Sequence, residues 1–243
     1  MRDISRYENE YLKADFEKYQ VIQRRKKVLE SIRGKRKIVE IGCGMDPLFK
    51  YIDWQVDEYT IFEPGKRFIE NAKEVAQSMG KNVLFVNELF EDSTLTNIMG
   101  YDSIVCSGLL HEVQFPDELL KSIYYASNSE TLIHINVPNA NSFHRLLAKE
   151  MNLIVDTKQF SERNINLQQN SVFDLDTLNR LCNDTGFRVD ECGSYFVKPF
   201  THVQMKSMMD NGIIDEKILD GLYFMTKYMP DMGSEIYVNC RRK

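Results

Sequence analysis

The chain has 243 residues, of which 43% are hydrophobic and 28% are charged, so it can bury one large core without disulfide or metal support. No apolar run approaches the about 18 residues of a membrane-spanning helix, and the N-terminus lacks the apolar stretch of a signal peptide, so we expect a cytoplasmic protein that does not enter a membrane. Its five cysteines are widely spread and include no C-x-x-C pair, which argues against a disulfide framework and a cysteine zinc site. We expect no bound metal.

Charge is distributed unevenly along the chain. Residues 1–37 contain twelve Lys and Arg against six Asp and Glu, a net charge of +6. Because the whole chain carries −5, the remaining residues carry −11. A basic N-terminal segment can dock on an acidic body, whereas an acidic body disfavours tight binding to nucleic acid. We therefore expect internal docking of this segment and no nucleic acid partner.

Periodicity predicts an N-terminal helix followed by alternating strands and helices. Apolar side chains recur at spacings of three or four, or multiples of these, between residues 11 and 32, which is typical of an amphipathic helix. The later predicted strands are residues 38–41, 59–62, 82–86, 102–106, 131–137, 187–189 and 235–238, and the later helices are residues 66–79, 116–127, 176–185, 203–210 and 216–228. The alternation predicts the α/β class with a doubly wound, mostly parallel sheet.

The polar segment 156–171, rich in Asn and Gln, interrupts this alternation and is predicted to be a loop or mobile flap. We divide the chain into a helical cover at residues 1–35 and a second unit at residues 36–243. Within that unit, residues 138–232 carry the helices expected to face a substrate or to act as a lid. The methionines between positions 205 and 232 stand at helical spacings and favour packing, in a lid or a dimer face.

The first buried strand ends in a loop that contains two glycines, Gly42-Cys43-Gly44-Met45-Asp46-Pro47, ahead of an expected helix. Glycines allow backbone amides to approach a ligand that any Cβ would keep away. The dinucleotide fingerprint G-x-G-x-x-G requires glycine at position 47, where proline stands, so the loop does not support NAD or FAD binding.

Polar side chains follow several predicted strands where they end. Glu63 comes just after the second strand, twenty-one residues beyond Gly42, and its carboxylate suits two ribose hydroxyls. Asn87 and Glu88 follow the third strand, and residues 107–112 follow the fourth. Ligands of open parallel sheets bind at this carboxyl edge, so these groups are expected to form one site.

Several motifs together resemble the class I S-adenosylmethionine-dependent methyltransferases. Residues 39–44 (Val-Glu-Ile-Gly-Cys-Gly) are similar to the family's first motif and residues 61–64 to its second, while residues 101–106 and 110–113 are similar to its fourth. Residues 131–139, 142–145 and 185–189 are similar to bacterial small-molecule members related to ubiquinone-pathway methyltransferases. The likeness extends from about residue 36 to 190 and includes the last strand. It implies a Rossmann-like methyltransferase fold with a seven-stranded sheet, an N-terminal helix and a C-terminal helical insertion.

The resemblance also implies which residues hold the cofactor, S-adenosylmethionine. Glu40 and the glycine backbones would face its methionine part, Glu63 its ribose, and Asn87 or Glu88 its adenine. The full predicted set is Glu40, Gly42, Cys43, Gly44, Glu63, Asn87, Glu88 and Ser107. Many members have a third glycine where this chain has Asp46, which leaves the path of the loop and the cofactor affinity open.

Methyl transfer mainly requires alignment of a nucleophile with the methyl group and exclusion of water, and a base assists a hydroxyl acceptor. His111, after the fourth strand, suits that base because its ordinary pKa is about 6.5, although packing beside the cofactor explains it equally well. Asn136, Asn139 and His144 complete the predicted catalytic set because they lie at or beyond the end of the fifth strand. His134, inside that strand, is interpreted as buried.

Four residues are candidates for contacts with the acceptor. Arg145 offers a planar fork for a carboxylate or phosphate, and Lys198 and His202 belong to an aromatic and basic cluster that suits an anionic group. Tyr11, on the basic helix, could close over the site. For each of these, an unspecific place on the surface or in the packing is the competing interpretation.

The sequence favours a methyltransferase that acts on a hydroxyl or an amine of a polar small molecule, such as a sugar of a bacterial surface-polysaccharide pathway. An RNA or DNA methyltransferase is the alternative, but residues 107–110 (Ser-Gly-Leu-Leu) replace the Asn/Asp-Pro-Pro-aromatic motif of amino-group base methylation. A non-catalytic protein that binds the cofactor is the third interpretation, for which Asp46 leaves room.

Overall fold

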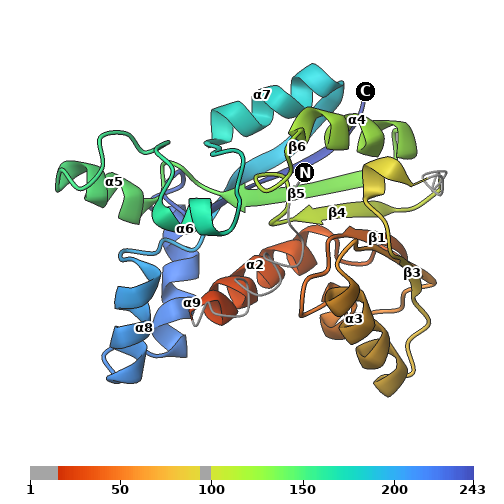
Figure 1. Cartoon of the computed structure of the whole chain (residues 1–243), viewed down its shortest axis with the longest axis horizontal. Coiled ribbons are helices and arrows are strands. Elements are labelled where there is room, and N and C mark those ends of the chain that lie inside the picture. The colour runs from red at the N-terminus through yellow and green to blue at the C-terminus, as the bar shows by residue number, and fades with distance from the viewer. Residues whose placement is uncertain (1–15, 94–99) are drawn as a thin grey trace.

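The computed structural model describes residues 16–93 and 100–243, and one mixed sheet forms its centre (Figure 1). The strand order is β3-β2-β1-β4-β5-β7-β6, in which β7 is antiparallel to both β5 and β6 while the pairs from β3 to β5 are parallel. The strands are β1 (Lys37–Ile41), β2 (Glu58–Phe62), β3 (Leu84–Val86), β4 (Ser103–Ser107), β5 (Leu132–Pro138), β6 (Phe187–Tyr195) and β7 (Glu235–Arg242). This sheet confirms the predicted doubly wound fold.

Helices cover both faces of the sheet because its central strands are apolar on both sides (Figure 1). On one face α4 (Pro116–Ala126) and α7 (Leu175–Thr185) bury Leu120 and Leu178 against β4, β5 and β7. On the other face α2 (Glu17–Ser31) and α3 (Lys66–Ser78) bury Val28 and Phe68 against β1 and β2.

The remaining helices lie toward the carboxyl ends of β4 and β5 (Figure 1). They are α5 (Phe143–Glu150), α6 (Glu162–Asn166), α8 (His202–Asp210) and α9 (Glu216–Phe224), the last two inserted between β6 and β7. A separate apolar cluster, which includes Phe16, Met205 and Tyr223, joins this insertion to the start of α2. Met205 is buried there, so at least this methionine serves packing.

Local structure differs from the prediction in three places. The helix expected after the glycine loop is only the 3₁₀ turn Leu48–Tyr51, because Pro47 before it and Ile52 after it are both extended. The polar segment predicted to be a loop contains the short helix α6. The last two strands are longer than predicted, because they form an antiparallel pair whose outer residues are polar and lack apolar periodicity.

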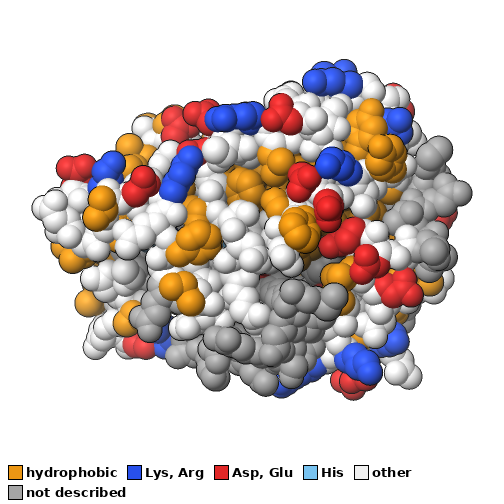
Figure 2. Space-filling view, turned by 45° about the horizontal axis from the view of Figure 1, so that its top comes forward, with side chains coloured by type: hydrophobic (Ala, Val, Ile, Leu, Met, Phe, Trp, Pro, Cys, Tyr) orange, Lys and Arg blue, Asp and Glu red, His pale blue; other side chains and the backbone are white. Residues whose placement is uncertain are grey.

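The described surface is mixed in charge. Figure 2 shows a row of acidic side chains beside apolar ones on one face of the molecule. None of the helices within residues 16–93 and 100–243 is both long and apolar enough to cross a membrane.

A largely buried ion pair attaches α2 to β7, the strand next to the β6 edge of the sheet. Arg24 of α2 reaches Glu235 at the start of β7, with Nε 3.0 Å from both carboxylate oxygens. Glu235 is only 1% exposed and also accepts hydrogen bonds from Gln20, Asn136 and the Tyr195 hydroxyl. Although burial raises the pKa of this carboxyl, Arg24 and these donors outweigh it and lower the pKa below its ordinary value. Glu235 is therefore a buried carboxylate that fixes the position of α2.

Candidate functional site

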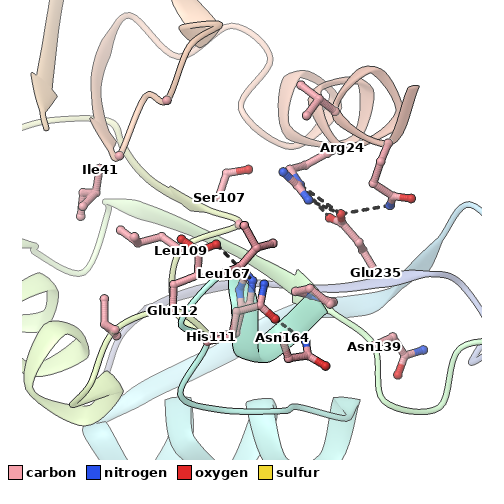
Figure 3. Close-up of a pocket in the computed structure, with 18 of the residues that line it drawn as sticks. Arg24, Ile41, Ser107, Leu109, His111, Glu112, Asn139, Asn164, Leu167 and Glu235 are labelled. Atoms are coloured by element: carbon pink, nitrogen blue, oxygen red, sulfur yellow. Dashed lines mark hydrogen bonds and ion pairs between the residues drawn. The ribbon is translucent and has the colours of Figure 1, made fainter. Parts of the chain in front are cut away.

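A cavity of about 1330 Å³ opens at the carboxyl ends of the parallel strands, beneath α2 and beside α5, α6 and α8. A pocket for one small ligand usually has about 300–1,000 Å³, so this cavity has room for a cofactor and an acceptor. Its lining includes the glycine loop, the ends of β2 and β4, and the pair Arg24 and Glu235, which Figure 3 shows on the side opposite Ile41. The predicted edge of the sheet thus forms one site.

The glycine loop is folded around the Glu63 carboxylate. Gly42 has a φ of +77°, which a side chain would strain, and its amide donates to the carbonyl of Phe62. Glu63 Oε2 accepts from the amides of Cys43, at 3.1 Å, and Gly44, at 3.4 Å, and Oε1 accepts from Gly65 at 2.8 Å. The structure therefore brings together the two features expected to bind the cofactor.

Glu40 lines the same cavity, but its carboxylate supports the loop from within. Both of its oxygens accept from the Leu48 amide, and Oε2 accepts from the Tyr59 hydroxyl at 2.7 Å. Burial raises its pKa to about 7, despite the opposing effect of these donors. Glu40 is thus poised to change charge near neutral pH beneath the 3₁₀ turn that follows the loop.

The predicted adenine residues do not line the cavity. Asn87 donates to the carbonyls of Glu63 and Pro64 and so fixes the turn after β2, while the Glu88 side chain is exposed. The next residues in the chain, from Leu89 to Asp92, form part of the cavity wall instead. Their position directly after the polar end of β3 was the signal for them in the sequence. Ser107 at the end of β4, which is predicted to contact the cofactor, lines the cavity.

His111 and Glu112 form a buried pair on the cavity wall. His111 Nε2 lies 3.7 Å from Glu112 Oε1, and the two residues are 4% and 5% exposed (Figure 3). The backbone carbonyl of His111 accepts from the amides of Asn170 and Ser171, which fixes the loop in place. A protonated imidazole at this position gains a carboxylate partner, so the pair can accept a proton from a neighbouring group.

Asn136 and Asn139 occupy structural positions. Asn136 is fully buried and donates to Glu235 Oε2 at 3.0 Å, and it is not part of the cavity wall. Asn139 does line the cavity, but its amide nitrogen donates to the carbonyls of Asp231 and Gly233, both at 2.9 Å. Its oxygen accepts from the Asn141 amide. These bonds hold the carboxyl end of β5 to the turn before β7, and no pattern in the sequence predicted them. His134, interpreted as buried, lies inside β5 against Asn239, and burial lowers its pKa to about 4.

Four of the remaining candidates line one end of the cavity: His144, Arg145, Lys198 and His202. Arg145 Nε donates to the Thr157 carbonyl at 2.7 Å and so also fixes the polar segment. Burial, with Lys198 and Arg145 nearby, holds the pKa of His144 well below its ordinary value. Lys198 is 2% exposed, and its Nζ lies 3.3 Å from His202 Nε2. Tyr11 lies outside the described residues.

Asp46, which replaces the third glycine of the family motif, links the glycine loop to α2. Its carboxylate pairs with Arg25 and accepts from the Tyr51 hydroxyl and from Lys50. Arg25 also lies over the Tyr51 ring, 3.4 Å from its centroid. The departure from the family pattern therefore has a structural role, and it tethers the loop to the helical cover.

Sequence reasoning missed the cavity residues that α2 and β7 supply, above all Gln20, Arg24 and Glu235. The excess of basic residues in the N-terminal segment was a signal for Arg24, whereas no pattern pointed to Gln20 or Glu235. Within the residues that the structure describes, no group of three or more His, Cys, Asp or Glu could hold a metal ion.

Comparisons with known proteins agree with this geometry. A family described as a methyltransferase domain matches residues 11–191, so the chain belongs to that family. This membership confirms the predicted class, an S-adenosylmethionine-dependent methyltransferase. No protein of curated function matches the sequence significantly.

Solved structures share the fold at low sequence identity. An S-adenosylmethionine-dependent methyltransferase of Thermotoga maritima superposes with a TM-score of 0.59 and 15% identity over 96% of this chain and 97% of its own. The plantazolicin methyltransferase BamL was solved with a triazolic desmethyl analogue and S-adenosylhomocysteine. It superposes with a TM-score of 0.56 and 17% identity over 98% of this chain and 89% of its own. The [4+2]-cyclase SpnF superposes with a TM-score of 0.58 and 14% identity over 90% of this chain and 79% of its own. The fold therefore hosts more than one reaction, and the acceptor has to be argued from this chain's own site.

The buried carboxyl of Glu40 generates a testable pH dependence. Between pH 4.5, its ordinary pKa, and about pH 7 the folded protein keeps the proton that the unfolded chain has lost. The free energy of unfolding therefore falls as the pH rises through this window, by up to about 3 kcal/mol from this group. The Glu40→Gln side chain cannot titrate. The free energy of unfolding of this variant, measured in urea, should therefore fall by that much less between pH 4.5 and 7.5. Parallel pH profiles for the two proteins would contradict this assignment.

Proposed function

We propose that this protein binds S-adenosylmethionine between the glycine loop and Glu63 and methylates a hydroxyl or an amine of a polar small molecule. The observation that carries the proposal is the Glu63 carboxylate, held on the cavity wall by three backbone amides of the loop and the turn after β2. When bound, the cofactor supplies an electrophilic methyl group on a positively charged sulfur. The acidic residues around the loop suit a cationic ligand.

Enclosure of the cavity favours a small acceptor. The helix α2 closes one side, while α5, α6 and the segment between them close another. Walls on two sides limit the access of water to the transfer and admit a compact molecule more readily than a base within a nucleic acid. A sugar hydroxyl is one acceptor of the required kind.

We assign the role of base to His111. Its imidazole lines the cavity, and the Glu112 carboxylate 3.7 Å away can stabilise the imidazolium that forms when a proton is taken from an acceptor hydroxyl. Asn139 would act by positioning, since its amide holds the end of β5 and the turn at Gly233. In this arrangement hydrogen bonds to the backbone hold the pocket in shape, and His111 accepts the proton.

Glu63→Gln tests the cofactor site. Loss of the charge weakens the hydrogen bonds from ribose hydroxyls and from the loop amides, so affinity for S-adenosylhomocysteine should fall by about 30-fold or more in isothermal titration. Glu70→Gln is the matched control, because Glu70 is exposed on α3 and lies outside the cavity wall. Equal affinities for the two variants, with unchanged thermal stability, would refute the role of Glu63.

His111→Gln tests the proton acceptor. The protein, given S-adenosylmethionine with a tritiated methyl group and an extract of small metabolites, should transfer label to an acceptor, and the variant should transfer it about 100-fold more slowly. S-Adenosylhomocysteine affinity should stay within a few-fold, because cofactor binding is assigned to the glycine loop and Glu63. Transfer at the rate of the unaltered protein would remove His111 from the mechanism.

A further inference from the structure

The polar segment 156–171 supplies one wall of the cavity and is held in place at both ends. At its start, Arg145 donates to two backbone carbonyls of the segment, with Nε 2.7 Å from the carbonyl of Thr157. At its end, two backbone amides of the segment donate to the carbonyl of His111. A wall that is fixed before a ligand arrives lowers the entropy cost of binding.

The segment presents uncharged polar groups to the cavity. Among its described residues, those that line the cavity carry no charge, and they are Gln159, Phe160, Ser161, Asn164, Asn166, Leu167 and Gln169. Asn164 donates to Gln169 Oε1. Within residues 16–93 and 100–243, the amide nitrogen of Gln169 and both polar side-chain atoms of Asn166 have no hydrogen-bond partner. Amide side chains donate and accept hydrogen bonds, which suits the hydroxyl groups of a ligand.

Charged side chains of the cavity wall are mostly bonded within the protein. The close pairs are Arg24 with Glu235, Arg25 with Asp46, Glu112 with His111, and Lys198 with His202. Glu40 and Glu63 accept from backbone amides, and Arg145 donates to the segment. The other acids of the wall are Glu91 and Asp92, after β3, and Glu118 of α4. An uncharged ligand therefore binds along the segment without breaking an ion pair.

Phe160 gives the segment an apolar surface as well. Its side chain is 41% exposed and lines the cavity, so a ligand can reach the ring. Ile154 and Leu167 belong to the same wall. Sugar rings have hydroxyl groups at their edges and apolar C–H faces, and an aromatic ring can pack against such a face. The segment therefore offers both kinds of contact that a sugar ring makes.

The segment also lies next to His111. A side pocket of about 30 Å³ has His111, Asn164 and Gln169 in its lining, and Figure 3 shows Asn164 and Leu167 near the imidazole. This volume admits a group the size of a water molecule, such as one hydroxyl. A ring bound along the segment therefore brings a hydroxyl close to the proposed base.

We propose that the methyl acceptor is an uncharged, polyhydroxylated ring such as a glycoside, which binds along the segment 156–171. Asn166 and Gln169 bind its hydroxyl groups, Phe160 covers its apolar face, and one hydroxyl lies beside His111. The proposal rests on the proposed function, because it names the class of acceptor for the same site. It gives the segment rich in Asn and Gln the role of recognising the acceptor.

The test uses the whole protein saturated with S-adenosylhomocysteine, whose binding is measured first by isothermal titration. Methyl glycosides of glucose, galactose, mannose, rhamnose and N-acetylglucosamine are then titrated by NMR, with cyclohexanol as the ring that has a single hydroxyl. At least one glycoside should bind about ten-fold or more tightly than cyclohexanol, since two net hydrogen bonds are worth that much. Glucose 6-phosphate is the charged sugar and should bind no more tightly than the best glycoside.

Gln169→Met keeps the length of the side chain and removes its amide. It should weaken glycoside binding by about three-fold or more and leave the affinity for S-adenosylhomocysteine unchanged. Gln77→Met is the matched control, because Gln77 is exposed on α3 and lies outside the cavity wall, and it should have no effect. If Gln169→Met does not fold, Asn166→Ala at the exposed end of α6 replaces it, with the same loss expected.

Three results would overturn the proposal. No glycoside reaches the ten-fold preference over cyclohexanol, glucose 6-phosphate binds more tightly than every uncharged glycoside, or the substitution in the segment leaves glycoside binding unchanged. Failure to bind S-adenosylhomocysteine would instead contradict the proposed function.

Discussion

The buried pair of Arg24 and Glu235 is the interaction on which the shape of the site depends. Taking two charges out of water is costly, and the attraction between them repays that cost only when further hydrogen bonds satisfy both. Gln20, Asn136 and Tyr195 supply them at Glu235. On the other side of the pair, a Cβ at Gly108 would lie 3.1 Å from Arg24 Nη1, so the glycine at the end of β4 makes room for the guanidinium. The helix α2 is thereby fixed across the carboxyl edge of the sheet.

A second link joins the same helix to the cofactor loop. Arg25 pairs with Asp46, the residue that departs from the family motif, and stacks on Tyr51. Neighbouring arginines of α2 thus hold two parts of the cavity wall, one at β7 and one at the glycine loop. Through them the basic N-terminal segment meets an acidic body within the molecule. The adjacent Lys26 pairs with the exposed Asp220 and lies over the rings of Tyr223 and Phe224, so it links α2 to α9 at the surface.

Sequence patterns were sufficient for the parallel half of the fold. The apolar runs of β1 and β4 are buried on both faces, and Gly42 and Glu63 could be placed because strand ends of a parallel sheet share an edge. The partner of Arg24 could not be predicted, since it lies 211 positions away and is chosen by tertiary packing. The structural role of Asn139 could not be predicted for the same reason. Its residue type and position suggested a catalytic amide, whereas its bonds to the turn before β7 exist only in the folded chain.

Urea unfolding and S-adenosylhomocysteine titration of Glu235→Gln test this account most directly. The substitution leaves Arg24 without its buried countercharge, so it should lower the free energy of unfolding by about 3 kcal/mol and weaken S-adenosylhomocysteine binding. Asp220→Asn breaks the exposed pair between α2 and α9 and should cost less than about 1 kcal/mol with no change in binding. Equal effects of the two substitutions would contradict the claim that the buried pair holds α2 in place as a wall of the site.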